Sequence, residues 1–132
     1  MAYSFSGFFI KEKQVDPSLC HRGHVSREIT DPFLGCGILT PNMDVSFGEC
    51  AKYLNGLGVS DCDWIFLNYE TWAGSVDYFM AFGIRAGRKF GPIEGDGDSA
   101  EVAFFEALDA FGLEEGAGYA FAPFERDFWE GA

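Results

Sequence analysis

Basic residues are scarce in this sequence, which has 9 Lys and Arg against 21 Asp and Glu and a formal net charge of -12 over 132 residues. Nucleic acids and anionic membranes are bound through clustered Lys and Arg, so this balance excludes both as expected partners. No apolar run approaches the roughly 18 residues that span a bilayer. Residues 1–10 also lack the basic start and the unbroken apolar core of a signal peptide. We therefore expect a cytoplasmic protein.

Motifs that perform catalysis or bind cofactors are lacking as well. The sequence has no phosphate-binding loop, nucleophile elbow or His-Glu-x-x-His pattern. Gly35-Cys36-Gly37 begins like a dinucleotide fingerprint, but Thr40 stands at the position of the third glycine. The alternating acids of residues 94–98 fail the calcium-loop template, because Ser99 stands where the sharp-turn glycine belongs. We expect no cofactor, and an enzyme is the less favoured class.

Cysteines number four, and none of them has the Cys-x-x-Cys spacing typical of zinc sites. The nearest approach to a metal-binding cluster is formed by Cys20, His21 and His24, with Cys36 further along the chain. Adjacent Cys20 and His21 need an awkward backbone to face one ion, so we expect no metal here and a loop with surface histidines. Nothing indicates an oxidising compartment, and we therefore expect reduced thiols that pack as small hydrophobic groups.

Hydrophobic residues, in contrast, are plentiful. They make up 48% of the chain, and Phe alone occurs 15 times. A disordered chain does not leave this much apolar surface in water, so the chain is expected to fold. Its length lies near the commonest size for one domain, and no repeat or linker divides it. We expect residues 1–132 to form a single domain.

Strand patterns occur in both halves of the chain. Residues 3–10 and 33–40 are predicted strands, and the glycines of the second permit a bulge or the close approach of another backbone. Residues 25–29 are also compatible with a short strand. Residues 63–71 and 76–85 form the best hairpin signal, with the turn between them. On the second hairpin strand the residues expected to share one face are Val76, Tyr78, Met80, Phe82 and Ile84.

Two helices are predicted from capping patterns. Ser46 with Glu49 and Asp98 with Glu101 have the spacing of a capping box, and apolar residues recur at helical intervals after each pair. The expected helices cover residues 47–57 and 98–111, with Gly58 and Gly112 as their stops.

The resulting order of elements is β-β-α-β-β-α. It predicts an α+β domain in which an antiparallel sheet of about four strands packs against two helices, most simply on one face. The Gly, Pro and Asp-rich residues 87–97 are predicted to be a connection. The C-terminal tail, residues 116–132, alternates aromatic and acidic residues, and we expect it to dock on the body of the domain.

The acidic residues are unevenly distributed. Residues 94–132 contain eleven of them and one base, Arg126, so most of the net charge lies in the last third of the chain. A negative field of this kind steers a basic partner, although the same carboxylates also keep an aromatic-rich domain soluble. Tryptophans at a turn or in the tail are candidate aromatic contacts for such a partner. The candidate partner-binding residues are Trp72, Glu101, Glu106, Asp109, Glu114, Glu115, Glu125, Asp127, Trp129 and Glu130.

Three functional hypotheses follow from these observations. The leading one is a non-catalytic acidic domain that binds a basic protein partner. A concrete version is a neutraliser that occludes a basic toxin or nuclease, as small acidic immunity proteins do, an analogy that rests on size, charge and the lack of motifs. The second is a small-ligand-binding domain or small enzyme with a pocket between sheet and helices, involving Cys36, Tyr69 or Trp72. The third is a structural homo-oligomer subunit, such as a homodimer joined through its sheet or aromatic tail.

Overall fold

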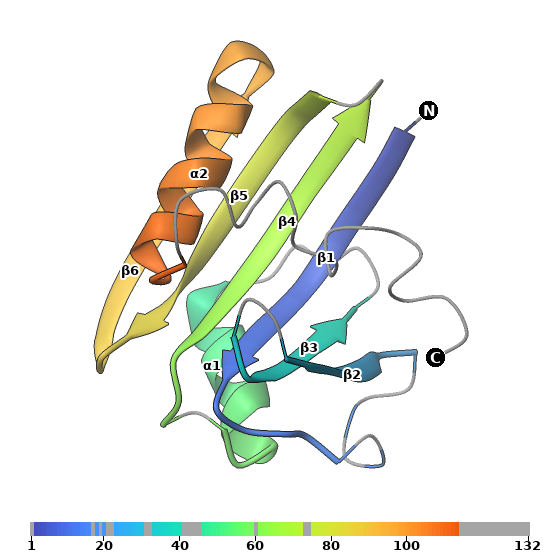
Figure 1. Cartoon of the computed structure of the whole chain (residues 1–132), viewed down its shortest axis with the longest axis vertical. Helices are drawn as coiled ribbons and strands as arrows, with labels where there is room; N and C mark the ends of the chain where they lie inside the picture. The colour runs from blue at the N-terminus through green and yellow to red at the C-terminus, as the bar shows by residue number, and fades with distance from the viewer. Residues whose placement is uncertain are drawn as a thin grey trace.

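The computed structural model describes residues 2–16, 18, 20, 23–30, 33–40, 46–59, 61–72 and 75–113. In this part of the chain one antiparallel sheet has 6 strands in the order β2-β3-β1-β4-β5-β6 (Figure 1). The strands are β1 (Ala2–Lys11), β2 (Val25–Ile29), β3 (Gly35–Leu39), β4 (Trp64–Trp72), β5 (Ser75–Arg85) and β6 (Arg88–Asp96), and the helices are α1 (Phe47–Gly56), the short 3-10 helix η2 (Gly97–Ser99) and α2 (Ala100–Ala110).

The predicted class, an α+β domain with one antiparallel sheet and two α-helices, is confirmed. The predicted strand number and order are wrong, because β2 adds a strand at one edge and β6 adds one at the other. β6 occupies the segment that was expected to be a connection. The pairing of β5 with β6 shifts between Ala81 and Gly83, and Gly91 in this irregular stretch has a φ of 84°. A bulge at an edge strand accommodates Gly91 and Pro92, residues that interrupt a strand pattern in the sequence.

The two α-helices lie on opposite faces of the sheet, which corrects the expectation that they share one face. In Figure 1 α2 lies in front of the sheet and α1 lies behind it. On β4, Ile65 and Leu67 pack in the core that includes α2, whereas Trp64 and Phe66 pack in the core that includes α1. Successive side chains of a strand point to opposite faces, so a strand that is apolar at every position is buried on both sides.

Each face therefore has its own hydrophobic core. Beneath α2, Phe104 contacts the rings of Tyr69 and Phe79 edge-on, with ring centroids 6.1 Å and 5.5 Å away. Beneath α1, Phe47 stacks on Trp64 with a centroid distance of 5.4 Å. The aromatic residues that dominate the composition are thus used mainly to fill the two layers between sheet and helices.

The glycines of β3 behave as the sequence predicted. Gly35 pairs with Lys11 on β1, and a Cβ atom at Gly35 would lie 1.9 Å from the carbonyl oxygen of Ile10. No side chain fits at that distance. β1 and β3 can therefore approach each other closely only because this position is glycine.

The predicted hairpin is formed by β4 and β5. Trp72 pairs with Ser75, so two residues connect the strands and the turn falls where it was expected. The register shifts between Glu70 and Thr71. Because of this irregularity Val76 packs against the core beneath α2, while Met80 and Ile84 pack against the core beneath α1. The expectation that Val76 shares their face is wrong.

The helix ends follow the predicted pattern at α1 and differ at α2. The Ser46 hydroxyl accepts a hydrogen bond from the Glu49 backbone N–H at 3.3 Å, as a capping box requires. At the other helix, Asp98 is not the cap. The Ser99 hydroxyl instead accepts from the backbone N–H of Asp96 at 3.1 Å and donates to its carbonyl oxygen at 2.9 Å.

Two further predictions concerned membrane-spanning helices and the C-terminal tail. Within the described residues, neither α1 nor α2 is long and apolar enough to cross a membrane. The aromatic tail, whose docking was predicted, lies outside the described residues.

Candidate functional site

A pocket of about 370 Å³ lies where β1 ends and β4 begins. It is a different pocket from the one expected between sheet and helices, since neither Cys36 nor Tyr69 lines it and both are buried. The lining residues are Lys11, Glu12, Lys13, Asp61, Cys62 and Asp63. These side chains line a polar surface hollow, in which the lysine amines, the carboxylates and the Cys62 thiol are the groups capable of nucleophilic chemistry.

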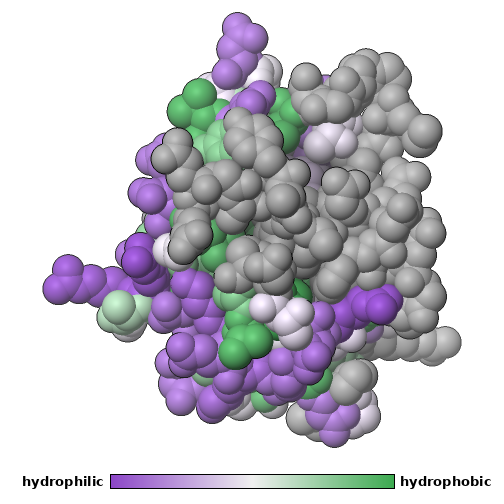
Figure 2. Space-filling view, viewed as in Figure 1, coloured by the Kyte–Doolittle hydropathy of each residue, from purple (hydrophilic) through white to green (hydrophobic). Residues whose placement is uncertain are grey.

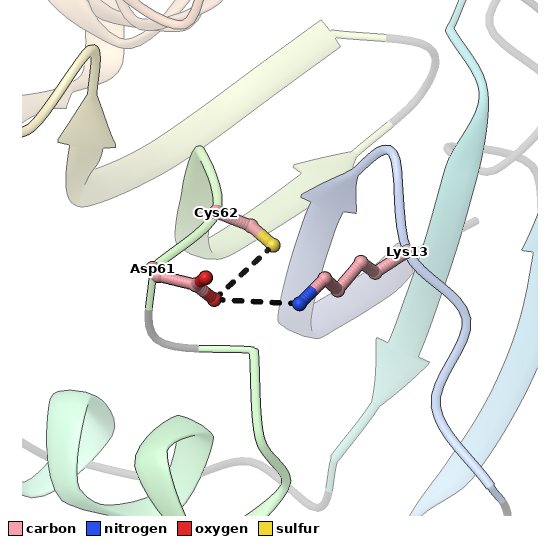
Figure 3. A network of polar contacts seen from close by, with 3 residues as sticks. All are labelled: Lys13, Asp61 and Cys62. Atoms are coloured by element: carbon pink, nitrogen blue, oxygen red, sulfur yellow. Dashed lines mark hydrogen bonds and ion pairs between the residues drawn. The ribbon is translucent and has the colours of Figure 1, made fainter.

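Lys13, Asp61 and Cys62 form a polar network at this pocket (Figure 3). The Lys13 Nζ lies 3.6 Å from the Asp61 Oδ1, and the Cys62 Sγ donates to the same oxygen at 3.7 Å. Burial and the neighbouring Asp61 carboxylate both raise the pKa of the Cys62 thiol. A thiol that stays protonated at neutral pH is a weak nucleophile, so the network does not activate Cys62.

The remaining polar groups of the pocket hold structural elements together. The Lys11 backbone N–H donates to the Asp63 carbonyl at 3.0 Å, and the Asp63 Oδ1 accepts from the Ala86 N–H at 2.9 Å in the turn between β5 and β6. The Lys11 Nζ donates to the carbonyl oxygen of Phe111, just after α2, and lies 4.5 Å above the Phe111 ring. Burial lowers the pKa of Lys11, and the Asp63 carboxylate opposes this effect. These contacts tie the end of β1 to the start of β4, to the β5–β6 turn and to the end of α2.

The other cysteines are held away from reactive environments. Cys36 and Cys50 are buried in the core beneath α1, and burial raises their pKa to about 11 and about 12. Burial also raises the pKa of Cys20. All four cysteines are free thiols in the structure. A thiolate nucleophile is therefore disfavoured at each of them at neutral pH.

Of the metal-ligand candidates of the sequence, Cys20, His24 and Cys36 lie within the described residues. His24 pairs its Nδ1 with the Tyr53 hydroxyl of α1 at 2.8 Å, and the two rings meet edge-on. His21 lies outside the described residues. Among the residues that the structure describes, no group of three or more His, Cys, Asp or Glu side chains is arranged to hold a metal ion.

Carboxylates gather at the opposite end of the sheet, where β4 ends, β5 begins, and β6 passes through η2 into α2. We call this group the acidic end. Its side chains are all exposed, and they come from five different elements although they are scattered in the sequence. The acidic end consists of Glu70, Asp77, Glu94, Asp96, Asp98 and Glu101.

The basic side chains of the described residues lie elsewhere in the fold. Lys11 is the last residue of β1 and Lys13 follows it, and Arg85, Arg88 and Lys89 surround the β5–β6 turn at that same end of the sheet. The others are Arg27 on β2 and Lys52 on α1. The acidic end thus contains no basic side chain among the described residues, whereas acids and bases are mixed at the other end, where Glu12, Asp61 and Asp63 line the pocket together with Lys11 and Lys13.

An exposed aromatic residue lies on the sheet face within the acidic end. Tyr78 is 37% exposed, and its direct cross-strand partners are Glu70 on β4 and Asp96 on β6. Residues that pair directly across neighbouring strands form a row. In the next row towards the middle of the sheet, two residues further along β5, Met80 pairs with Asn68 on β4 and with Glu94 on β6. The two following rows, which contain Phe82 and Ile84, pack in the core beneath α1. The rows of Tyr78 and Met80 thus join the acidic end, to which Glu70, Asp96 and Glu94 belong, to that core, against which Met80 packs.

Of the partner-binding residues predicted from the sequence, three are described with their side chains. Glu101, Glu106 and Asp109 are exposed on α2, and Val102 beside them is 67% exposed. Figure 2 shows that hydrophilic residues dominate the described surface on this face. Trp72 ends β4, and its side chain is outside the described part of the molecule. Also outside it are Glu114, Glu115, Glu125, Asp127, Trp129 and Glu130.

The sequence did not identify most of the acidic end. Glu70 and Asp77 belong to the hairpin, and they join Glu94 and Asp96 only through the pairing of β4, β5 and β6. Recognising β6 as a strand was the missing step, since it aligns its acids with those of the hairpin.

Fold and site together define an α+β domain with a sheet covered on both faces and one acidic end. No family model matches the chain, and no curated protein or solved structure matches it.

Proposed function

We propose that this protein is a non-catalytic, acidic protein-binding domain whose acidic end receives a basic surface of a partner protein. The observation that supports this function is the convergence of six exposed carboxylates, from β4, β5, β6, η2 and α2, with no basic side chain among them in the described residues. Charges spread evenly over a surface suffice for solubility, and solubility does not require that they gather at one end.

Such a cluster acts on a partner before contact. Carboxylates within a Debye length, about 8 Å at physiological ionic strength, add their fields and attract a positively charged surface. The attraction raises the rate of encounter and orients the partner towards the acidic end. Like charges repel one another, and a bound basic surface relieves that repulsion.

A basic toxin or nuclease is the concrete class of partner. A nuclease needs clustered Lys and Arg to hold the phosphates of its substrate, and an acidic domain that covers those residues competes with the substrate for them. In this role the protein is a cytoplasmic neutraliser that needs no cofactor or catalytic residue of its own. Its specificity comes from the shape and side chains of the acidic end.

The proposal is tested by affinity capture with matched variants of the domain. One variant neutralises three carboxylates of the acidic end, Glu70→Gln, Glu94→Gln and Glu101→Gln. The control neutralises three exposed carboxylates elsewhere and therefore changes the net charge equally. Its substitutions are Glu28→Gln, Glu49→Gln and Asp61→Asn. Each protein is immobilised and exposed to a lysate of the native organism, and the captured proteins are quantified by mass spectrometry.

We expect a basic protein that is retained by the wild type and by the control variant and is lost from the acidic-end variant. Recovery of the same proteins, in the same amounts, by both variants would contradict the proposal, because net charge would then account for the binding.

A further inference from the structure

We infer that two copies of this chain associate through the outer edge of β6, which pairs antiparallel with the β6 of a second copy. This association goes beyond the proposed function, because the occupant of the edge is the chain itself and not a basic partner. Two features of β6 support it, namely its irregular pairing with β5 and the order of its charged and apolar side chains.

β6 is an edge strand in the part of the chain that the structure describes. Among the described strands its single neighbour is β5, and none of its nine residues is buried (Figure 1). Every second residue of an edge strand directs its backbone N–H and C=O away from the sheet. The outer side of β6 is therefore a template on which another strand can pair.

The bulge in β6 decides which of its residues share a face. Phe90 pairs with Gly83 on β5. Three residues further along β6, Ile93 pairs with Ala81, which is only two residues away from Gly83. β6 thus has one extra residue in this stretch, as in a β-bulge. Phe90 and Ile93 consequently point to the same face, and both pack against the core beneath α2.

Lys89 and Glu94 flank that apolar pair and share the opposite face. Their partners on β5 are Ile84 and Met80, which both pack against the core beneath α1. Both side chains are exposed, and the Lys89 Nζ lies 4.4 Å from the centroid of the Phe47 ring in α1. An ammonium group has three N–H donors, so it keeps this ring contact and still donates to a carboxylate beside it.

β6 is complementary to itself when a second copy runs antiparallel beside it. A twofold axis at the middle of the bulge places Phe90 opposite the second copy's Ile93. The same axis places Lys89 opposite the second copy's Glu94. The two residues of each opposed pair share a face, as antiparallel pairing requires. Because the axis repeats both pairs, the interface contains two apolar pairs and two pairs of opposite charge.

The bulge also favours a second copy over an unrelated strand. A regular strand in register with β6 before the bulge is out of register after it, so its side chains fall on the wrong faces. Pro92 has no backbone N–H to donate, and edges with a bulge and a proline resist pairing in general. In a second copy the extra residue lies at the same place, so equal numbers of residues separate the opposed pairs on both strands.

The paired stretch is short. It ends before the turn into η2, because the backbone N–H and carbonyl of Asp96 are already bonded to the Ser99 hydroxyl. Small interfaces give weak, transient complexes, so we expect a dimer that forms as the protein concentration rises through the micromolar range. Glu94 belongs to both this edge and the acidic end, and the dimer withdraws its carboxylate from the acidic end.

Charge exchange across the edge tests this pairing. Sedimentation equilibrium at physiological ionic strength, where the net charge of the two copies is screened, measures the dissociation constant of the dimer. Lys89→Glu and Glu94→Lys each place like charges opposite one another, and we expect each to weaken the dimer about tenfold or more. The controls Lys52→Glu on α1 and Glu28→Lys on β2 make the same changes of charge at other exposed positions and should leave the dimer unchanged.

Two further samples restore the opposite charges. An equimolar mixture of the Lys89→Glu and Glu94→Lys proteins should form a heterodimer about as tight as the wild-type dimer. The double variant, with both substitutions in one chain, should dimerise by itself. These recoveries show that loss of the dimer in the single variants does not come from misfolding, and thermal melting of each variant checks this independently.

A wild type that stays monomeric up to millimolar concentration would overturn the inference. A dimer that both single substitutions leave intact, or that neither the mixture nor the double variant restores, would overturn it as well, because the two copies would then not meet through β6. Capture of a basic protein by the acidic end does not depend on any of these results.

Discussion

Phe82 shows how single aromatic side chains hold the core beneath α1. Its ring stacks on Phe66 with a centroid distance of 5.4 Å and contacts Phe47 and Trp64 at 5.8 Å and 6.4 Å. We expect Phe82→Ala to lower the free energy of unfolding by about 3–5 kcal/mol, through lost burial and the cavity that remains. Urea denaturation measures the change.

Val102→Ala is the matched control for this residue. Val102 is 67% exposed on α2, and removing its methyl groups should change the free energy of unfolding by no more than about 0.5 kcal/mol. A similar effect of the two substitutions would contradict the burial of Phe82.

The buried thiols make stability depend on pH in a definite direction. Burial raises the pKa of Cys36 from 9.0 to about 11 and that of Cys50 from 9.0 to about 12. Above about pH 9 the unfolded chain therefore loses thiol protons that the folded protein keeps, and the free energy of unfolding falls as pH rises. We expect urea denaturation to show this decline, and to show a smaller one in the double variant Cys36→Ala, Cys50→Ala.

Comparing slopes rather than absolute stabilities makes this test specific. The alanine substitutions also lower stability by leaving cavities, but that loss does not vary with pH. Burial lowers the pKa of Lys11, which makes its contribution rise with pH over part of the same range, and this contribution is common to both proteins. Equal slopes in the two proteins would show that the thiols titrate normally in the fold.

At the scale of elements, α2 ends without a basic residue of its own in its last turn. The positive charges that a helix C-terminus favours come from the strands instead. The Lys11 Nζ donates to the carbonyl oxygen of Phe111, and the Arg85 guanidinium donates to that of Asp109 at 3.3 Å. Lys11 of β1 and Arg85 of β5 thus fix the end of the helix that packs over β5 and β6.

Lys11→Met tests this arrangement. Methionine keeps an apolar stem and removes the charge and the donor, and we expect the free energy of unfolding to fall by about 1–2 kcal/mol. Lys13→Met is the control, because the ion pair of Lys13 with Asp61 is exposed, at 48% and 76% of the two side chains, and exposed pairs contribute about 0–1 kcal/mol. A larger loss in the Lys13 variant would mean that Lys11 does not stabilise the end of α2.

The elements that the sequence predicted are those with a regular pattern or a capping residue. Both helices, the hairpin and the first strand follow from periodicity, from Ser46 and from the glycines after each helix. β6 was missed because Gly91 and Pro92 interrupt its pattern, and the bulge that accommodates them depends on its pairing with β5. The placement of the helices on opposite faces had a signal in the unbroken apolar run at residues 64–67, which indicates burial on both sides.

The candidate site was predictable to the extent that it lies on one helix. Glu101 follows from the acidity of the last third of the chain, whereas Glu106 and Asp109, predicted by the same argument, lie further along α2 and are not part of the acidic end. The grouping of Glu70 with Asp96 on either side of Tyr78 does not, because it depends on the register of three strands. A shift of one residue would move each of these side chains to the other face of the sheet. Composition therefore indicated that the surface is negatively charged, and the pairing of the strands decides where on the fold that surface lies.

At the scale of the whole molecule, the basic side chains of the described residues lie away from the acidic end. The acidic end lies where β4 turns into β5 and α2 begins, and Arg85, Arg88 and Lys89 lie at the other end of the same sheet (Figure 1). Under the proposed function, a domain with an end that carries only acidic charge approaches a basic surface with that end first. Its orientation on such a partner would then be set before the two proteins touch.

The association rate of the captured partner, measured as a function of salt by stopped-flow fluorescence, tests this account most directly. For the wild type and the control variant with Glu28→Gln, Glu49→Gln and Asp61→Asn, we expect a fast rate that falls steeply as ionic strength rises. For the variant with Glu70→Gln, Glu94→Gln and Glu101→Gln, we expect a slower rate and a shallower dependence on salt. Equal rates and equal salt dependence in the two variants would contradict the claim that the acidic end captures the partner.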